Sequence, residues 1–304
     1  MLAIDLGGTK CHGVLVDLAG ATLAEERRPT HGEGDAAAAL LATIAALRAA
    51  AAARALPVRA VVIGVPAVPD PASGLLVAGP NVDWSGFDLG ALLREHVPEP
   101  CRVENDVTLA AIGEAWRGDG RDAASFVMLS IGTGVGGAVW VNGQLVRGRH
   151  NAAGELGALL TARAQLGAAP GVVAGLEAVA SGPAIERRAA ELDSGRRRSA
   201  TDLLAAAAAG EDVATMVVEE LLDHIAMAIV DVVAVIDPER VILDGGVGRA
   251  LAPFVDAIAA RVARRVPDGP ELRISSLGPN STLIGAIACA LGLDREGSPP
   301  VPRP

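Results

Sequence analysis

Runs of apolar residues along the first part of the chain predict an alternation of strands and helices. The chain opens with a strand, a glycine turn and two further strands, at residues 2–6, 13–17 and 22–26. An alanine-rich segment over 35–55 predicts a helix, with Asp35 in a suitable place for its N-cap. The following apolar runs predict a buried strand at 58–65, a helix at 89–96, a strand at 101–104 and a helix at 107–116.

The same order restarts near residue 125. A strand at 125–131, a glycine turn and a strand at 138–141 lead to Asn142-Gly143, a strong hairpin signal, and to a return strand at 144–147. This repetition indicates two related units, each beginning with a β-meander whose first turn is rich in glycine. The rest of the chain predicts helices at 213–236, 251–264 and 282–291, with strands at 240–244 and 271–275.

Alternating strands and helices are typical of the α/β class, and two such units predict a cleft between two domains. We expect an N-terminal domain over 1–117, completed by a helix within 282–296, and a second domain over 118–281. The Pro-rich segment 297–304 is expected to be disordered.

The composition narrows the classes of partner. A formal net charge of -10 disfavours nucleic acid as a ligand. The apolar runs are interrupted before they reach membrane-spanning length, and no basic segment followed by an apolar stretch opens the chain, so we expect a cytoplasmic protein. The three cysteines are far apart and form no CxxC pair, which indicates free thiols in a reducing compartment.

Two glycine-rich turns follow the first strand of each unit. Gly7-Gly8-Thr9-Lys10 lies between two strands, so it is neither a P-loop nor a dinucleotide fingerprint. Glycines allow backbone N–H groups to approach an anion, and Thr9 adds a hydroxyl group. Lys10 is the only lysine in a chain rich in arginine. Asp5, at the end of the strand, is suitably placed to hold Mg²⁺ through water.

The second turn, Gly132–Gly137, contains Thr133 and Gly134 in the equivalent place. Either turn alone is also compatible with a plain tight hairpin. Their equivalent positions in repeated units favour a pair that grips a polyphosphate. A third glycine pair, Gly245-Gly246, follows a buried strand and is expected to accept an adenosine, although the first turn of a helix would explain it equally well.

Four segments, in this order, resemble the ROK family of bacterial sugar kinases and related repressors, which have the actin-like, ribonuclease H-like fold. They are Ala3-Ile4-Asp5-Leu6-Gly7-Gly8-Thr9-Lys10, Val103-Glu104-Asn105-Asp106, Gly132-Thr133-Gly134-Val135-Gly136-Gly137 and Ala153-Gly154-Glu155-Leu156-Gly157. The resemblance extends over roughly residues 2 to 292. Each motif is modest, but the ordered set is quite specific.

The resemblance implies roles for the matching residues. Asp106 corresponds to the catalytic base that takes the proton of a sugar hydroxyl. The residues expected to bind the sugar are Asn81, Asn105, Glu155, Glu177 and Gly64; those expected to bind the nucleotide are Asp5, Gly7, Gly8, Thr9, Lys10, Thr133, Gly134, Gly245 and Gly246. Asn105 and Asp106 precede a predicted helix, so they also suit an N-cap, and both roles are compatible.

One departure from the family pattern concerns zinc. Most members carry a His three residues after the first glutamate and a CxCGxxGC segment before the second. The two glutamates here keep the family separation, 177 − 155 = 22 residues, but the ligand positions hold Ala158, Ala168, Pro170 and Gly175, none of which binds zinc. We therefore expect no zinc, a loop over 159–175 held by packing alone, and an altered sugar preference because Ala158 removes a hydrogen-bond partner.

These residues together predict ATP-dependent phosphorylation of a hexose, glucose or a glucose-like amino sugar, at the 6-hydroxyl. Mg²⁺ is the expected cofactor, and the resemblance implies a homodimer, because members of the family commonly form one. Three alternatives remain. One is a kinase specific for an amino sugar, such as 3-amino-3-deoxyglucose, N-acetylglucosamine or N-acetylmannosamine. Another is a sugar-sensing regulator without kinase activity, which the acidic charge and the first motif at Ala3 disfavour. The third is a non-catalytic sugar binder. GTP or polyphosphate as donor stays open.

Overall fold

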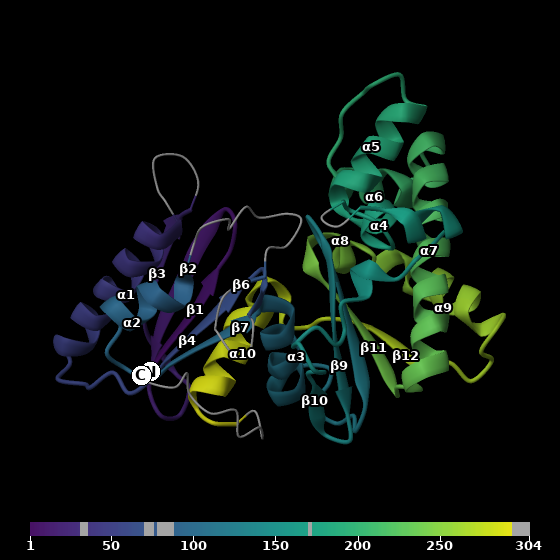
Figure 1. Cartoon of the computed structure of the whole chain (residues 1–304). Coiled ribbons are helices and arrows are strands. Elements are labelled where there is room, and N and C mark those ends of the chain that lie inside the picture. Colours follow the sequence, from purple (N-terminus) through teal and green to yellow (C-terminus); the bar gives the residue numbers. More distant parts are fainter. Residues whose placement is uncertain (31–35, 70–75, 78–87, 170–171, 294–304) are drawn as a thin grey trace. The chain divides into compact units, whose positions relative to one another are not determined.

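The computed structural model describes residues 1–30, 36–69, 76–77, 88–169 and 172–293 (Figure 1). The chain forms two compact units. Unit 1 comprises Met1–Gly118, Arg147–Ala152 and the segment from Asn280 onward, and unit 2 comprises Asp119–Val146 and Ala153–Pro279. Each unit has its own sheet and its own core, and each is described here by itself.

Unit 1 is built on a five-stranded mixed sheet with the order β3-β2-β1-β4-β7. β1 pairs with β2 in antiparallel fashion and β2 with β3, whereas β1, β4 and β7 are parallel. The strands are β1 (Leu2–Leu6), β2 (Lys10–Val16), β3 (Thr22–Pro29), β4 (Val61–Val65) and β7 (Cys101–Asn105). The helices are α1 (Ala36–Ala52), α2 (Leu89–His96), α3 (Asp106–Arg117) and α10 (Ser281–Ala290), and β5 (Val68–Pro69) pairs with β6 (Leu76–Val77).

The period-two alternation of β1 separates the two faces of this sheet. Leu2, Ile4 and Leu6 are fully buried in a core that also contains Leu40 and Leu47 of α1. Ala-rich α1 has high helix propensity, and its leucines give it one buried side. Asp5 alternates with the core-facing residues and so belongs to the other face of the sheet.

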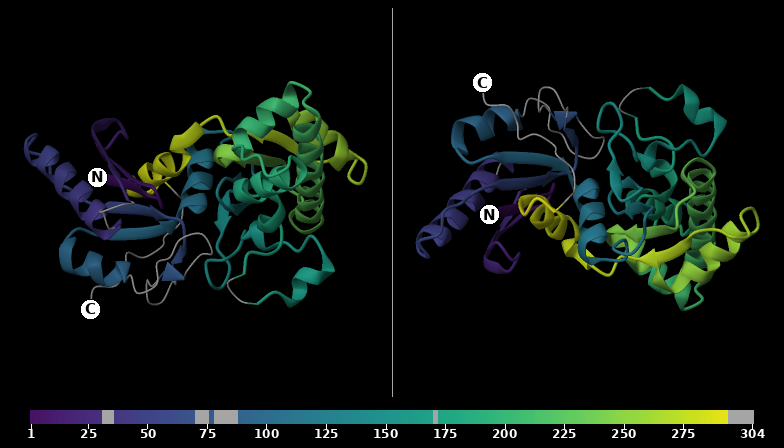
Figure 2. Two further views of the ribbon diagram at one scale, coloured as in Figure 1. Left: turned by 90° about the horizontal axis from the view of Figure 1, so that it is seen from above. Right: turned by 90° about the horizontal axis from the view of Figure 1, so that it is seen from below.

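That other face is covered by α3 and α10, which come from distant parts of the sequence. A Cβ on Gly285 of α10 would lie 1.7 Å from the carbonyl oxygen of Leu109 in α3, so the two helices touch through their backbones. A Cβ on Gly64 would lie 2.9 Å from side-chain atoms of both Leu109 and Thr282. Figures 1 and 2 show α10, in yellow, beside the purple and blue strands of unit 1 in every view.

Unit 2 repeats this sheet with the order β10-β9-β8-β11-β12. β8 pairs with β9, and β9 with β10, in antiparallel fashion, while β8, β11 and β12 are parallel. The strands are β8 (Phe126–Ile131), β9 (Val135–Val141), β10 (Gln144–Val146), β11 (Arg240–Asp244) and β12 (Glu271–Ile274). The repeated strand order confirms the repetition predicted from the sequence.

The helices of unit 2 are α4 (Glu177–Ala180), α5 (Gly182–Leu192), α6 (Ala200–Ala208), α7 (Asp212–Ile236), α8 (Gly245–Ala250) and α9 (Val255–Ala263). Short 3₁₀ helices are formed by Leu156–Ala158, Arg163–Gly167, Ala252–Phe254 and Gly278–Asn280. α7 buries Leu221, Ile225 and Ile229 in one core with Val127 and Leu129 of β8. In the part of the chain that the structure describes, no helix is both long and apolar enough to cross a membrane.

The structure corrects three element boundaries that concern the glycine motifs. β2 begins at Lys10 rather than at Gly13, so Lys10 belongs to the strand that follows the first turn. The predicted turn Gly132–Gly137 is shorter, because β9 begins at Val135 and includes both Gly136 and Gly137. The predicted turn at Gly245-Gly246 is instead the first turn of α8, which follows β11 directly. α4, α5, α6 and α8 were not among the predicted helices.

Candidate active site

The candidate residues of unit 1 gather at the carboxyl edge of its parallel strands. Asp5 pairs in register with Gly64 on β4, and Val65 pairs with Asn105 on β7. The turn after β1 and the junction between β7 and α3 therefore leave the sheet at the same edge. Ligands of open α/β sheets bind outside this edge.

The turn at 7–9 is held in shape by its own backbone and by Thr30. The Gly7 N–H donates to the Lys10 carbonyl at 2.8 Å, and the Thr30 hydroxyl donates to the Gly7 carbonyl at 2.9 Å. The Thr30 N–H also donates to the Thr9 carbonyl at 3.1 Å. Gly8, Thr9 and Lys10 are exposed, so a fixed turn presents its tip to solvent.

Asp5 lies beneath this turn with restricted access to solvent. Burial raises the pKa of the Asp5 carboxyl, and the nearby charges of Lys10 and His12 oppose that rise. A divalent cation would favour the ionised form in the same way as Lys10 does. A carboxylate oxygen next to a phosphate-binding type of turn is the donor type that Mg²⁺ prefers.

Asn105 and Asp106 are fixed by the start of α3. Asn105 is the N-cap: its side-chain oxygen accepts from the N–H groups of Val107 at 2.9 Å and Thr108 at 3.0 Å. The Asp106 carboxylate also accepts from the Val107 N–H, at 2.8 Å. The capping alternative raised from the sequence thus holds for Asn105, and it orients the half-buried carboxylate of Asp106 at a helix N-terminus, where negative charge is stabilised.

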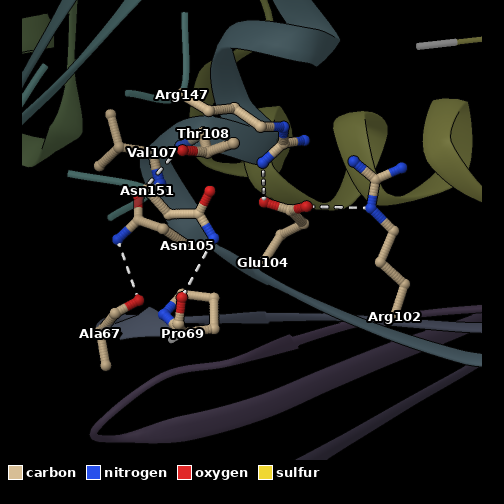
Figure 3. A network of polar contacts seen from close by, with 9 residues as sticks. All are labelled: Ala67, Pro69, Arg102, Glu104, Asn105, Val107, Thr108, Arg147 and Asn151. Carbon is tan, nitrogen blue, oxygen red and sulfur yellow. Dashed lines mark hydrogen bonds and ion pairs between the residues drawn. The ribbon is translucent and has the colours of Figure 1, made fainter. Parts of the chain in front are cut away.

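A polar network supports this junction (Figure 3). Glu104, 6% exposed, accepts from Arg102 Nε at 3.0 Å and from Arg147 at 2.9 Å. The Asn105 side chain donates to the Ala67 carbonyl at 3.4 Å, and Asn151 donates to the Pro69 carbonyl at 3.2 Å. The segment Arg147–Ala152 is thereby attached to β5 and to β7, the strand that directly precedes the candidate base.

In unit 2 the glycine motifs also meet at the carboxyl edge of parallel strands. The Gly132 N–H donates to the Gly134 carbonyl at 2.9 Å and closes the turn around Thr133. The Gly132 carbonyl accepts from the Gly182 N–H of α5 at 2.8 Å, and a Cβ on Gly132 would lie 3.9 Å from the Gly246 nitrogen. The structure therefore brings the turn and the start of α8 together.

The two glycines of the third motif have different surroundings. Gly245 has φ +80°, and a Cβ there would lie 2.3 Å from the Ile131 carbonyl oxygen. Gly246 is exposed, and a Cβ there would meet no atom within 4 Å. Gly245 thus makes the close turn from strand to helix, and Gly246 leaves open space. Next to it, Asp244 is buried and forms an ion pair with Arg249 at 2.6 Å.

Glu155 and Glu177 lie close together in unit 2. Glu177 is 9% exposed, and its Oε2 accepts from the Val135 N–H of β9 at 2.8 Å. Burial raises the pKa of the Glu155 carboxyl, and the charge of Glu177 raises it further. The lack of a side chain at Gly137 lets the backbone before Glu155 pack against β9, because a Cβ at Gly137 would lie 2.6 Å from the Gly154 carbonyl oxygen.

The loop between these two carboxylates is not held by packing alone, contrary to the expectation from the sequence. Its 3₁₀ helix, Arg163–Gly167, contains no buried residue. Gln165 instead forms hydrogen bonds to both ends of the loop. A glutamine in a loop gives no sequence signal of this kind, so sequence reasoning missed it, together with Thr30 and Arg147.

Two residues named in the sequence analysis fall outside the part of the chain that the structure describes. Asn81 and Pro170 lie outside the described residues. Gly64 is buried, and its lack of a side chain is explained by the packing of Leu109 and Thr282 on it, so a sugar contact there stays a prediction. Among the described residues, no group of three or more His, Cys, Asp or Glu side chains is arranged to hold a metal ion.

Comparison with known proteins decides the family. The family model described as "ROK family" matches residues 1–292. The chain belongs to the ROK family. Among the curated relatives of the chain, the glucokinase of Thermotoga maritima is 31% identical over 309 residues, which cover 95% of this chain and 96% of the relative. The N-acetyl-D-glucosamine kinase of Yersinia pseudotuberculosis is 30% identical over 74% of this chain and 77% of its own length.

Solved structures of ROK proteins have the same fold. A ROK glucokinase from Streptomyces griseus, in complex with glucose and AMPPNP, superposes with a TM-score of 0.77 at 27% identity and covers 95% of this chain and 98% of its own. A ROK transcriptional regulator, a homolog of E. coli MLC, gives 0.82 at 26% identity over 96% of this chain and 79% of its own. The predicted α/β class and actin-like fold are confirmed.

Proposed function

We propose that this ROK protein transfers the terminal phosphate of ATP to a hexose, at the 6-hydroxyl, with Asp106 as the general base. The observation that carries the proposal is the junction of β7 and α3, where Asn105 caps the helix and Asp106 holds a half-buried carboxylate at its N-terminus. The glucokinase relatives support the same reaction class.

The base has a limited task in this reaction. The Asp106 carboxylate accepts the proton of the 6-hydroxyl while the hydroxyl oxygen forms its bond to the γ-phosphorus. The bond from the γ-phosphorus to the bridging oxygen breaks, and ADP leaves. Positioning supplies most of the rate acceleration, because phosphoryl transfer needs little covalent chemistry from the protein. The hydrogen bond from the Val107 N–H orients the carboxylate for this step.

We assign the remaining sugar contacts to Asn81, Asn105, Glu155 and Glu177. Carboxylate and amide groups suit hydroxyl pairs because they accept hydrogen bonds at two positions or both donate and accept. Glu177 is already oriented by the hydrogen bond from the Val135 N–H. Glu155 is exposed, so its carboxylate is accessible to a sugar in the open site.

The nucleotide contacts are assigned to the glycine turns. The fixed turn Gly7–Lys10 offers backbone N–H groups and one ammonium, and the closed turn at Gly132–Gly134 offers Thr133. The open space at Gly246 suits the adenosine. Asp5 would hold Mg²⁺, which neutralises charge on the phosphates when bound.

A substrate panel tests this function. Purified protein is assayed with ATP, Mg²⁺ and a set of hexoses and amino sugars, and kcat/KM is measured for each by coupled ADP release. We expect turnover of at least one hexose, with the phosphate at the 6-position by NMR. A protein that turns over none of these sugars would refute the proposal. Replacing ATP by GTP or polyphosphate in the same assay identifies the donor.

An amino sugar is the second candidate, and one observation favours it. Glu155 and Glu177 are close enough for the charge of one to raise the pKa of the other. A sugar with a free amino group would bring a positive charge to this pair and relieve the repulsion. A higher kcat/KM for an amino sugar than for glucose in the panel would select this candidate. The expected homodimer stays a prediction, which light scattering on the purified protein tests.

A further inference from the structure

The loop between the two candidate sugar-binding glutamates returns to its starting point. A Cβ on Gly175, which has φ +68°, would lie 2.7 Å from the carbonyl oxygens of both Gly157 and Leu159. A Cβ on Gly157 would lie 3.5 Å from the Cβ of Glu177. The segment that follows Glu155 is therefore packed against the segment that precedes Glu177, with no room for side chains between their backbones.

Gln165 ties this loop together from within. Its side-chain oxygen accepts from the Thr161 N–H at 2.8 Å, from the Thr161 hydroxyl at 3.1 Å and from the Ala162 N–H at 3.1 Å. Its side-chain nitrogen donates to the Gly175 carbonyl at 3.4 Å. One amide thus joins the beginning of the loop to a residue two positions before Glu177.

Apolar packing contributes little to the order of the loop. Leu166, next to Gln165, is 76% exposed, and Leu160, Val172 and Val173 are exposed as well. This arrangement reverses the usual one, in which loop leucines turn inward and glutamines outward. Among the described residues of the loop, Leu159 packs against the core of unit 2 but these four side chains do not, so the hydrogen bonds of Gln165 help to offset the entropy of ordering the loop.

We propose that Gln165 is a positioning residue that closes this loop and thereby keeps Glu155 and Glu177 together for binding the sugar. The Gly175 carbonyl accepts both from Gln165 and from the Ala178 N–H of α4, so the amide is linked to the first turn of the helix that begins with Glu177. The inference rests on the proposed function only in naming the sugar as the ligand of the two glutamates.

Three substitutions separate the contributions of the amide. Gln165→Ala removes the side chain. Gln165→Met keeps its length and removes every hydrogen bond. Gln165→Glu keeps an acceptor for the three donors at the beginning of the loop but has no N–H for the Gly175 carbonyl. Leu166→Ala, at the exposed neighbouring position, is the matched control.

Limited proteolysis measures the order of the loop without any sugar. Arg163 is exposed in the loop, so trypsin cuts after it once the short helix opens locally. We expect Gln165→Ala and Gln165→Met to be cut after Arg163 roughly tenfold faster than the wild type, with Gln165→Glu intermediate. Mass spectrometry identifies the fragment that ends at Arg163.

Steady-state kinetics measures the effect on the glutamates. We expect KM for the best hexose of the panel to rise roughly tenfold in Gln165→Ala and Gln165→Met and about threefold in Gln165→Glu. KM for ATP should stay at the wild-type value, and kcat should change by less than about twofold. If Gln165 only stabilised the fold, its substitution would lower the fraction of folded enzyme and hence the apparent kcat, without a selective rise in KM for the sugar.

The outcomes are distinct. Equal tryptic rates in wild type and Gln165→Met would refute the closing role, and faster cleavage with an unchanged KM for the sugar would refute the positioning role. A wild type that phosphorylates no sugar would refute the proposed function instead. In that case calorimetric binding of the same sugars replaces KM, and a wild type that binds none of them refutes both proposals.

Discussion

The Glu177 carboxylate accepts a hydrogen bond from the Val135 N–H at 2.8 Å, which joins a candidate sugar ligand to the first residue of β9. The shortened turn thus ends at the point where β9 fixes Glu177. The turn assigned to the nucleotide, Gly132–Gly134, is therefore joined to the candidate sugar ligand Glu177 through the N–H of the next residue, Val135.

Glu177→Gln should shift the pH profile of the reaction. The substitution keeps an oxygen for the Val135 N–H but removes the charge that raises the pKa of Glu155. The pKa of Glu155 then falls toward its ordinary value, although burial still opposes ionisation. Because the ionised carboxylate is the stronger acceptor for hydroxyl groups, the acid limb of kcat/KM for the sugar should move to lower pH. An unmoved acid limb would contradict the coupling of the two groups.

The same shift has a consequence for stability. A carboxyl group whose pKa is raised by folding stabilises the protein below its unfolded pKa, and this contribution is lost as the pH rises through the folded pKa. Glu177→Gln should therefore raise Tm at pH 8 relative to the wild type and have less effect at pH 4. Thermal unfolding at the two pH values measures the difference.

Asp106→Asn should abolish turnover and preserve the fold. The asparagine oxygen can still accept from the Val107 N–H, and the cap formed by Asn105 is untouched. We expect kcat to fall about 10²- to 10⁴-fold, while the hexose Kd from calorimetry stays within about threefold. A variant with nearly normal kcat would exclude Asp106 as the base.

Glu104→Met should destabilise unit 1 because it leaves two arginines beside an apolar group. Glu104 is almost completely buried, whereas Arg147 retains some exposure. We expect the free energy of unfolding in urea to fall by about 3 kcal/mol. Glu104→Met combined with Arg147→Met should lose less than the sum of the two single losses. Strict additivity would mean that the pair does not interact.

The neighbouring glycines Gly245 and Gly246 offer a matched pair of substitutions. Gly245→Ala places a methyl group against the Ile131 carbonyl at positive φ, so it should cost about 3 kcal/mol of stability. Gly246→Ala meets no atom and should change stability by less than about 0.5 kcal/mol. It should nevertheless raise KM for ATP, since it fills the space assigned to the adenosine. An unchanged KM for ATP would contradict the assignment of the space at Gly246 to the adenosine.

Treatment with a zinc chelator should leave the fold intact, because we expect no bound zinc. Ala158, Ala168 and Gly175 offer no side-chain ligand, and Gln165 bonds the ends of the loop instead. Dialysis against a zinc chelator should therefore leave Tm unchanged within about 1 °C. Stoichiometric zinc in the purified protein, found by mass spectrometry of the metals, would contradict this prediction.

The regular elements were largely predictable because apolar periodicity is a local property of the sequence. β1, β11 and α2 begin and end where the pattern indicated. β2 and β9 both begin earlier than predicted, and in β9 the reason is that Gly136 and Gly137 are typical of turns. The structure shows another reason for Gly137, namely the close approach of Gly154.

Contacts between residues that are far apart in the sequence could not be predicted from apolar periodicity. Glu104 and Arg147 are 43 positions apart, and nothing local marks them as partners. Gln165 looks like any surface glutamine until the fold brings the Gly175 carbonyl to it. Candidate residues in ordered motifs could be named from the sequence, whereas the groups that hold them in place could not.

The contact of Gly285 with Leu109 has a consequence for biosynthesis. The first strands of unit 1 precede unit 2 in the sequence, whereas α10, which covers one side of the same sheet, follows it. Almost all of unit 2 must therefore be synthesised before α10 can pack against Leu109 and Gly64. Until then one face of the sheet of unit 1 lacks its cover, so unit 1 cannot reach its final packing before synthesis has passed through unit 2.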